Sequence, residues 1–258
     1  MREFLEDAHN HRNDGYGRAQ RAEQKILPKR FYKQVAIVKE NEGFFITLDN
    51  KPVKTPSKKP VFVPKEALAL ALQKEWQSQG EFIDTQSMPL TRLVNSGIEG
   101  GEGIEIELSK EIIKYAANDL LLYRADSPKK LVEMQENQWD SILLTLTKAY
   151  EVKFISTIGI IHVEQPQNSL DRLADLLEGL DKISLAALVS ITSLSGSGLI
   201  AIAIFKNLIT PDAGWSAAHV DEDFNDSFWG QDEEAIKRRN KRKTEFDAAV
   251  QLLDLLKS

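Results

Sequence analysis

The sequence has 258 residues, of which 42% are hydrophobic and 28% charged, and its formal net charge is −6 at pH 7. This composition is typical of a globular protein and excludes a collagen-like or wholly disordered chain. The absence of cysteine excludes thiol nucleophiles, disulfides and thiolate metal sites. The acidic charge balance argues against a nucleic-acid partner, which would require a basic surface.

Residues 1–27 show no apolar periodicity and are predicted to form a polar N-terminal arm. This stretch has no apolar signal core, and its Asp and Glu content argues against an organellar transit peptide. We therefore expect a cytoplasmic protein of bacterial origin. His9 and His11 lie in this arm, which offers no preorganised set of ligands, so we expect no metal site there.

Residues 28–95 are predicted to form a small α/β domain. Apolar residues alternate before a turn at residues 41–43 and again after it, at Phe44, Ile46 and Leu48, which is the pattern of an antiparallel β-hairpin. Four prolines between residues 52 and 64 restrict the following strands to short edge strands. From residue 65 the apolar period becomes helical, and this helix is expected to end at Gly80 and to pack against the sheet.

Residues 96–258 are predicted to form a larger, mainly α-helical domain. The glycine-rich stretch 81–103 is expected to connect the two domains, and the β-branched stretch 152–163 is expected to be extended. The predicted fold class is therefore α+β, with a small N-terminal antiparallel sheet and its packed helix followed by the helical domain.

Residues 183–205 contain no charged residue and are long enough to span a membrane. Six of these residues are Ser or Thr, and the middle reads Ser195-Gly196-Ser197-Gly198, where a helix is expected to break. The segment is therefore predicted to be a buried pair of helices, with no membrane insertion.

Asp119 and Gln135 occupy apolar stripes of two predicted helices, and a polar side chain buried there needs a hydrogen-bond partner. We expect Arg124 and a neighbouring backbone group to satisfy Asp119 and so to fix the turn between the two helices. The alternative is that Asp119 faces water at a frayed helix end.

The segment from Trp215 to Trp229 carries the most informative pattern. On one continuous helix, Val220, Phe224 and Phe228 form a core stripe, and Glu222 points away from the core. A second face with large aromatic side chains is either deeply buried or a binding surface. The residues on this second face are Trp215, Ala218, Asn225 and Trp229.

The sequence offers no clear catalytic motif. The run Gly196-Ser197-Gly198 lacks the residues that would complete a phosphate-binding loop or a nucleophile elbow, and small residues there are explained by close helix packing. His162 and His219 have no catalytic partner that the sequence can place. An enzyme is therefore not expected. The alternative function is a soluble hydrolase or a small-ligand-binding protein with a site between the two domains.

A series of short motifs runs in order along residues 28–256. Their order and spacing resemble the ATP synthase assembly factor twelve family, and although no single motif is diagnostic, the whole series makes a chance match very improbable. The motifs are Arg30-Phe31-Tyr32-Lys33, Leu48-Asp49-Asn50-Lys51-Pro52-Val53-Lys54-Thr55-Pro56, Glu75-Trp76, Gln79-Gly80-Glu81, Met88-Pro89-Leu90-Thr91, Asp119-Leu120-Leu121, Tyr123-Arg124-Ala125, Gln138-Trp139-Asp140, Gln165-Pro166, Val220-Asp221-Glu222 and Trp229-Gly230.

The resemblance implies a chaperone that binds the unassembled alpha subunit of the F-one sector of ATP synthase and prevents its aggregation before it assembles with beta subunits. It implies no cofactor, and we expect a monomer when the protein is free. By resemblance, Trp76 is the family's helix tryptophan and Asp221-Glu222 its acidic motif. The residues expected to bind the partner are Asp221, Glu222, Trp215, Trp229 and Trp76.

Overall fold

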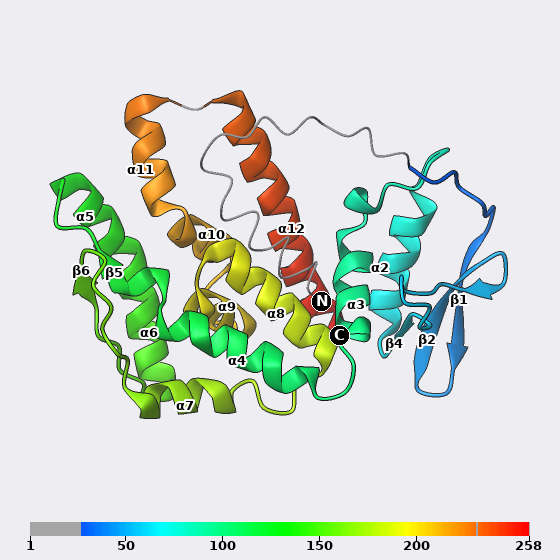
Figure 1. Ribbon diagram of the computed structural model, residues 1–258, viewed down its shortest axis with the longest axis horizontal. Coiled ribbons are helices and arrows are strands. Elements are labelled where there is room, and N and C mark those ends of the chain that lie inside the picture. The colour runs from blue at the N-terminus through cyan, green and yellow to red at the C-terminus, as the bar shows by residue number, and fades with distance from the viewer. Residues whose placement is uncertain (1–26, 231, 258) are drawn as a thin grey trace. The chain divides into compact units, whose positions relative to one another are not determined.

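The computed structural model describes residues 27–230 and 232–257, and the chain divides into two compact units (Figure 1). Unit 1 consists of residues 1–102, 182–186 and 251–258, and unit 2 consists of residues 103–181 and 187–250. The predicted polar arm, with His9 and His11, lies outside the described residues except for residue 27.

Unit 1 contains the antiparallel sheet and its helix, as the apolar periodicity predicts. The hairpin strands β1 (Val35–Glu40) and β2 (Gly43–Leu48) pair antiparallel, and β3 (Lys51–Pro52) and β4 (Phe62–Val63) pair with β2. Helix α2 (Glu66–Gln77) packs on this sheet through Leu68 and Leu72, which are fully buried because their spacing places both on one face of the helix. The tip of the Phe62 ring occupies the space beside Gly43, since an added Cβ atom would lie 2.2 Å from it unless the ring moved.

The stretch 81–103 is more than the connection that the sequence predicts, because it contains the short helix η1 (Thr85–Ser87) and helix α3 (Pro89–Glu99). The Glu75 carboxylate caps α3, since it accepts hydrogen bonds from the backbone N–H groups of Leu90 and Thr91, both at 2.8 Å. Burial raises the pKa of Glu75. This cap, together with Pro89 at the first helical position, explains why α3 begins there.

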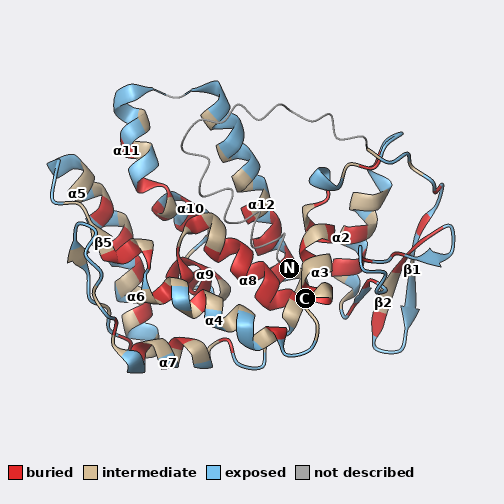
Figure 2. Cartoon of the chain, viewed as in Figure 1, coloured by how far each residue is buried: buried red, intermediate tan, exposed pale blue. Residues whose placement is uncertain are grey.

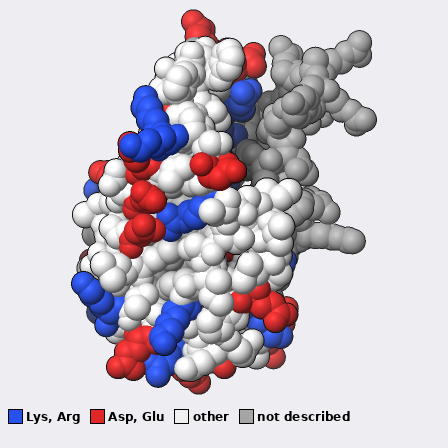
Figure 3. Space-filling view, turned by 90° about the vertical axis from the view of Figure 1, so that its left-hand side faces the viewer, with Lys and Arg blue, Asp and Glu red and all other residues white. Residues whose placement is uncertain are grey.

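Unit 2 is mainly helical, and its only sheet within the described residues is the parallel pair of β5 (Tyr123–Arg124) and β6 (Thr157–Ile158). The stretch 152–163 is therefore a strand only at β6, which lies on the side of the molecule seen in Figure 3. The helices after α3 are α4 (Ile104–Ala117), η2 (Leu120–Leu122), α5 (Lys129–Gln135), η3 (Glu136–Asp140), α6 (Ser141–Tyr150), α7 (Gln167–Asp175), α8 (Lys182–Ser195), α9 (Gly198–Phe205), α10 (Pro211–Ala218), α11 (Val220–Trp229) and α12 (Glu233–Lys257).

Helices α8 and α9 are the buried pair that the uncharged stretch predicts, and Figure 2 shows both among the buried elements. None of the helices in the described part of the chain is long and apolar enough to span a membrane. Gly198 allows α9 to lie directly against α4, because an added Cβ atom would meet the Ile112 carbonyl oxygen at 2.4 Å.

Asp119 is fully buried, and the alternative that it faces water is wrong. Its carboxylate accepts hydrogen bonds from the backbone N–H groups of Leu121, at 3.1 Å, and of Leu199 in the first turn of α9, at 3.0 Å. Burial raises its pKa to about 7. The prediction that Arg124 satisfies Asp119 is also wrong, because the Arg124 guanidinium binds the Asp140 carboxylate at 2.7 Å and the Leu121 carbonyl at 2.9 Å. Backbone N–H groups and the Ser197 side chain therefore supply the partners that the sequence assigned in part to an arginine.

Candidate partner-binding site on helices α10 to α12

The predicted continuous helix from Trp215 to Trp229 is wrong, because α10 ends at Ala218 and α11 begins at Val220. His219, with φ −118° and ψ 17°, occupies the break. The two tryptophans therefore do not share a face. Trp215 is 8% exposed, whereas Trp229 is 88% exposed.

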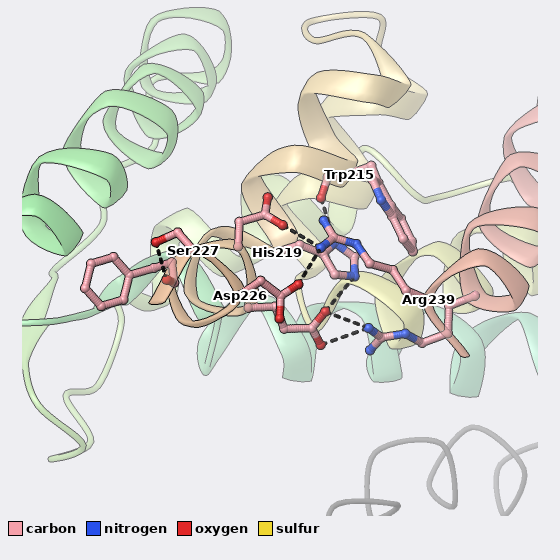
Figure 4. Close-up of polar contacts among 9 residues, drawn as sticks. Trp215, His219, Asp226, Ser227 and Arg239 are labelled. Carbon is pink, nitrogen blue, oxygen red and sulfur yellow. Dashed lines mark hydrogen bonds and ion pairs between the residues drawn. The ribbon is translucent and has the colours of Figure 1, made fainter. Parts of the chain in front are cut away.

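Trp215 packs inside unit 2 between side chains of its own helix end and of α12 (Figure 4). The centroid of its ring lies 3.9 Å from that of His219 and 5.1 Å from that of Phe246. The ammonium group of Lys243 lies 5.9 Å from the Trp215 ring centroid. Trp215 therefore fixes α10 against α12 and does not offer its ring to a partner.

Two arginines of α12 hold the acidic first half of α11. The Arg242 Nη2 donates hydrogen bonds to both carboxylate oxygens of Glu222, each at 2.8 Å, and such charge-assisted hydrogen bonds are stronger than those between neutral groups. Arg239 lies 2.5 Å from a carboxylate oxygen of Asp223 and 3.7 Å from one of Asp226. Figure 4 shows the Arg239 side chain reaching the carboxylates of α11. These ion pairs fix the position of α11 relative to α12.

The buried side chain of His219 lies next to these ion pairs. Its Nδ1 lies 2.7 Å from the Trp215 carbonyl oxygen, so Nδ1 carries the proton that is donated there. Its Nε2 has no hydrogen-bond partner among the described residues and lies 3.9 Å from a carboxylate oxygen of Glu222. Burial lowers the pKa of His219 although the Trp215 carbonyl and Glu222 act in the opposite direction, so the imidazole is neutral at neutral pH.

The opposite side of α10 and α11 is held by the helical stretch formed by α5 and η3. The buried Gln135 side chain donates to the Asp221 carboxylate and accepts from the Ala125 N–H, both at 2.8 Å. The Trp139 indole N–H donates to the Ala217 carbonyl at 2.8 Å. Trp139 lies in η3, a π-helical turn, and such turns are frequent at functional sites because they redirect side chains. Gln135 is thus a structural polar residue, and its partners are a backbone amide and a residue of the acidic motif.

The C-terminal end of α11 exposes two aromatic side chains. Phe224 is buried, but Phe228 is 61% exposed, so the predicted core stripe ends one helical turn early. The ammonium group of Lys130 lies 5.4 Å from the Phe228 ring centroid. Trp229 is the last residue of α11, and Gly230, which follows it, has a φ of +76°. Asp221, Glu222 and Trp229 therefore lie on one helix whose end is apolar and exposed.

Trp76 lies in unit 1, whereas the other four predicted partner-binding residues lie in unit 2. It is half-buried, its ring lies 5.7 Å from that of Tyr32, and the Tyr32 hydroxyl donates to its carbonyl oxygen at 2.6 Å. Its role as a partner contact remains a prediction.

Sequence reasoning missed the functional placement of His219, Arg239 and Arg242. The charged run after residue 232 has the pattern of a solvated helix. This pattern does not indicate that two of its arginines, three residues apart, form ion pairs with carboxylates on α11. That i, i+3 spacing on one helical face was the signal available. Within residues 27–230 and 232–257, no three His, Asp or Glu side chains are grouped closely enough to hold a metal ion.

Comparisons with known proteins agree along most of the chain. A protein-family model described as ATP12 chaperone protein matches residues 29–147, a stretch that contains Trp76, Asp119, Arg124 and Gln135. The mitochondrial protein atp12 of Schizosaccharomyces pombe is 27% identical over 219 residues, which cover 80% of this chain and 75% of that protein.

Two solved structures are more similar still. The Atu1473 protein of Agrobacterium tumefaciens is 39% identical, with a TM-score of 0.86, and the match covers 99% of this chain and 97% of that one. Atp12 of Paracoccus denitrificans is 34% identical, with a TM-score of 0.82, and the match covers 89% of this chain and 98% of that one. Identity at this level over nearly the full length of a solved Atp12 shows that the chain belongs to the ATP12 chaperone family.

Proposed function

We propose that this protein is an ATP synthase assembly chaperone that binds the unassembled alpha subunit of the F-one sector and keeps it from aggregating until it meets beta subunits. Its membership of the ATP12 chaperone family supports this proposal. A chaperone of this kind needs a higher affinity for the free subunit than for the assembled one, and this difference requires no catalytic group.

The observation that carries the proposal is the exposed aromatic end of a rigidly held helix. Phe228 and Trp229 are largely exposed, while α11 is fixed by arginines on one side and by Gln135 on the other. Aromatic side chains are common anchors of protein interfaces, and a preorganised anchor loses little conformational entropy on binding. Such a surface fits an apolar site on a protein partner.

The predicted partner-binding residues divide by exposure. Trp229 is the proposed apolar contact, and Asp221 and Glu222, which lie about two helical turns earlier on α11, would supply negative charge, which favours a basic edge on the partner. Trp215 acts indirectly, because it is buried and holds α10. Trp76 would form a separate contact from unit 1.

Size-exclusion chromatography of the protein mixed with the alpha subunit and, separately, with the beta subunit of the same organism tests this proposal. We expect co-elution with alpha alone. Elution apart from both subunits would contradict the proposed partner.

The variant Trp229→Ala should weaken alpha binding at least tenfold, which corresponds to about 1.4 kcal/mol. The matched variant Trp229→Phe retains an aromatic ring and should keep most of the affinity, as titration calorimetry would show. Because the side chain is largely exposed, neither change should lower the unfolding temperature. Equal affinity of the alanine variant and the wild type would remove α11 from the interface.

A further inference from the structure

Unit 2 exposes an apolar loop that the site on α11 does not use. Residues 154–163, here called the isoleucine loop, include β6 and contain no Asp, Glu, Lys or Arg. Their exposed fractions are 67% for Ile158, 93% for Ile160 and 74% for Ile161. Three neighbouring isoleucines with this exposure form an apolar patch of the kind that marks interaction sites.

The isoleucine loop is held in place by polar groups at its base. The buried Gln165 side chain donates to the carbonyls of Ile155 and Val163, at 2.9 and 3.1 Å, and accepts from the Ile155 N–H at 2.9 Å. The Gly159 N–H donates to the Arg124 carbonyl at 2.9 Å. The isoleucines are thus presented to solvent by a fixed backbone, and a fixed apolar surface binds a partner with little loss of entropy.

The backbone of β6 is open on one side. Strands β5 and β6 form a sheet of two strands, so the outer edge of β6 has no partner strand within the described chain. Because Gly159 directs its N–H to β5, the preceding residue, Ile158, directs its N–H to the outer side. An open strand edge binds an extended segment through main-chain hydrogen bonds.

The distribution of charged residues around the isoleucine loop further restricts which partner can bind there. Lys153 precedes the isoleucine loop and Glu164 follows it, and both are exposed. Figure 3 looks onto this side of the molecule and shows a broad area without charged side chains between groups of Lys, Arg, Asp and Glu. A charged residue of a partner placed against the isoleucines would lose hydration without gaining an ion pair. The complementary ligand is therefore uncharged over the length of the loop.

We propose that the isoleucine loop binds an extended, uncharged apolar segment of the client polypeptide, which adds to the outer edge of β6 as a further strand. The inference rests on the proposed function in that the client is the unassembled alpha subunit. The main chain of β6 would hold the segment in register, and Ile158, Ile160 and Ile161 would cover its apolar side chains.

The test compares the double variant Ile160→Ser/Ile161→Ser and the single variant Ile161→Ser with the control Ile106→Ser. Ile106 lies in α4 and is 61% exposed, against 74% for Ile161, so its substitution is matched to the single variant and removes a similar apolar surface elsewhere on unit 2. We expect alpha binding to weaken at least tenfold in the double variant and less than twofold in the control, with unchanged thermal unfolding in both. Wild-type affinity in the double variant would overturn the proposal.

Two further readings separate this inference from the proposed function. If the wild type does not bind alpha, the proposed function fails. The loop is then tested with another unfolded client, by measuring whether the protein keeps heat-unfolded citrate synthase from aggregating. Loss of protection in the double variant alone then supports it, and equal or absent protection overturns it. Light scattering measures the molar mass in solution and so tests whether a second copy of this protein occupies the isoleucine loop. If the wild type is a dimer and the double variant is a monomer, the proposal is overturned.

Discussion

The Glu222 carboxylate is half-exposed on α11, where a partner can reach it, and it also accepts both hydrogen bonds from Arg242. It can therefore contribute to partner binding and to the position of α11. Glu222→Lys removes the negative charge and places a cation beside Arg242. We expect alpha binding to weaken at least tenfold, about 1.4 kcal/mol, and the free energy of unfolding to fall by about 1 kcal/mol or less, the usual value of a half-exposed ion pair.

The charge-swapped pair Glu222→Lys/Arg242→Glu separates these two roles. The swap restores an ion pair between α11 and α12, so denaturant unfolding should return to the wild-type midpoint. Binding measured by calorimetry should stay weak, because the carboxylate no longer lies on α11. If affinity recovers together with stability, Glu222 acts only by positioning the helix.

Asp119 gives the folded protein a pH dependence with a definite sign. Its pKa is raised by burial from 3.8 to about 7, so the folded state holds the proton more tightly than the unfolded chain. Its contribution to stability is therefore present in full below pH 3.8 and is lost as the pH rises through 7.

The variant Asp119→Asn isolates this effect. The stability advantage of the wild type over the variant should shrink between pH 5 and pH 7, by at most about 1.4 kcal/mol per pH unit. Urea unfolding of both proteins at pH 5, 6 and 7 measures this difference. A difference that is constant over these pH values would show that the carboxyl group keeps one protonation state.

At the scale of elements, α11 is fixed from two directions, by α12 through arginines and by α5 through Gln135. Gln135→Ala leaves the Ala125 N–H and the Asp221 carboxylate without this partner, and a lost buried hydrogen-bond partner costs about 1–3 kcal/mol. We expect that loss in denaturant unfolding and faster amide exchange in α11. Unchanged exchange in α11 would mean that α12 alone fixes the helix.

The contact between α9 and α4 depends on a glycine. Gly198→Ala would place a methyl group 2.4 Å from the Ile112 carbonyl oxygen, where only a backbone shift can make room. We expect a loss of about 1–3 kcal/mol in the free energy of unfolding. Gly80→Ala is the matched control, because an added Cβ atom there meets nothing within 4 Å. Equal unfolding midpoints of the two variants would contradict the close approach.

At the scale of the whole molecule, the sequence predicted those helices and strands that a pattern within the segment itself indicates. The hairpin around residues 41–43 and the buried pair α8 and α9 follow from apolar periodicity and an uncharged run, and the structure confirms both. The aromatic and acidic character of α11 was also visible, but the exposure of its end was not, because periodicity alone cannot say where the neighbouring elements stop.

What the sequence could not show depends on contacts between distant residues. The cap that Glu75 gives to α3 joins positions 15 residues apart, and the pairing of Asp119 with Leu199 joins positions 80 apart. Nearest-neighbour reasoning assigned Asp119 to Arg124 instead. The arginines of α12 were missed for the same reason, since their partners lie on another helix.

The division of the chain sets the order in which the protein can fold during synthesis. Unit 1 begins with the first strands of the sheet but also includes residues 182–186 and 251–258. Every residue of unit 2 has therefore left the ribosome before the last segment of unit 1 does, whereas domains built from one continuous segment can fold in the order of their synthesis. The unit that starts first is the one that is completed last, and a chain released from the ribosome after residue 250 would contain all of unit 2 but only part of unit 1.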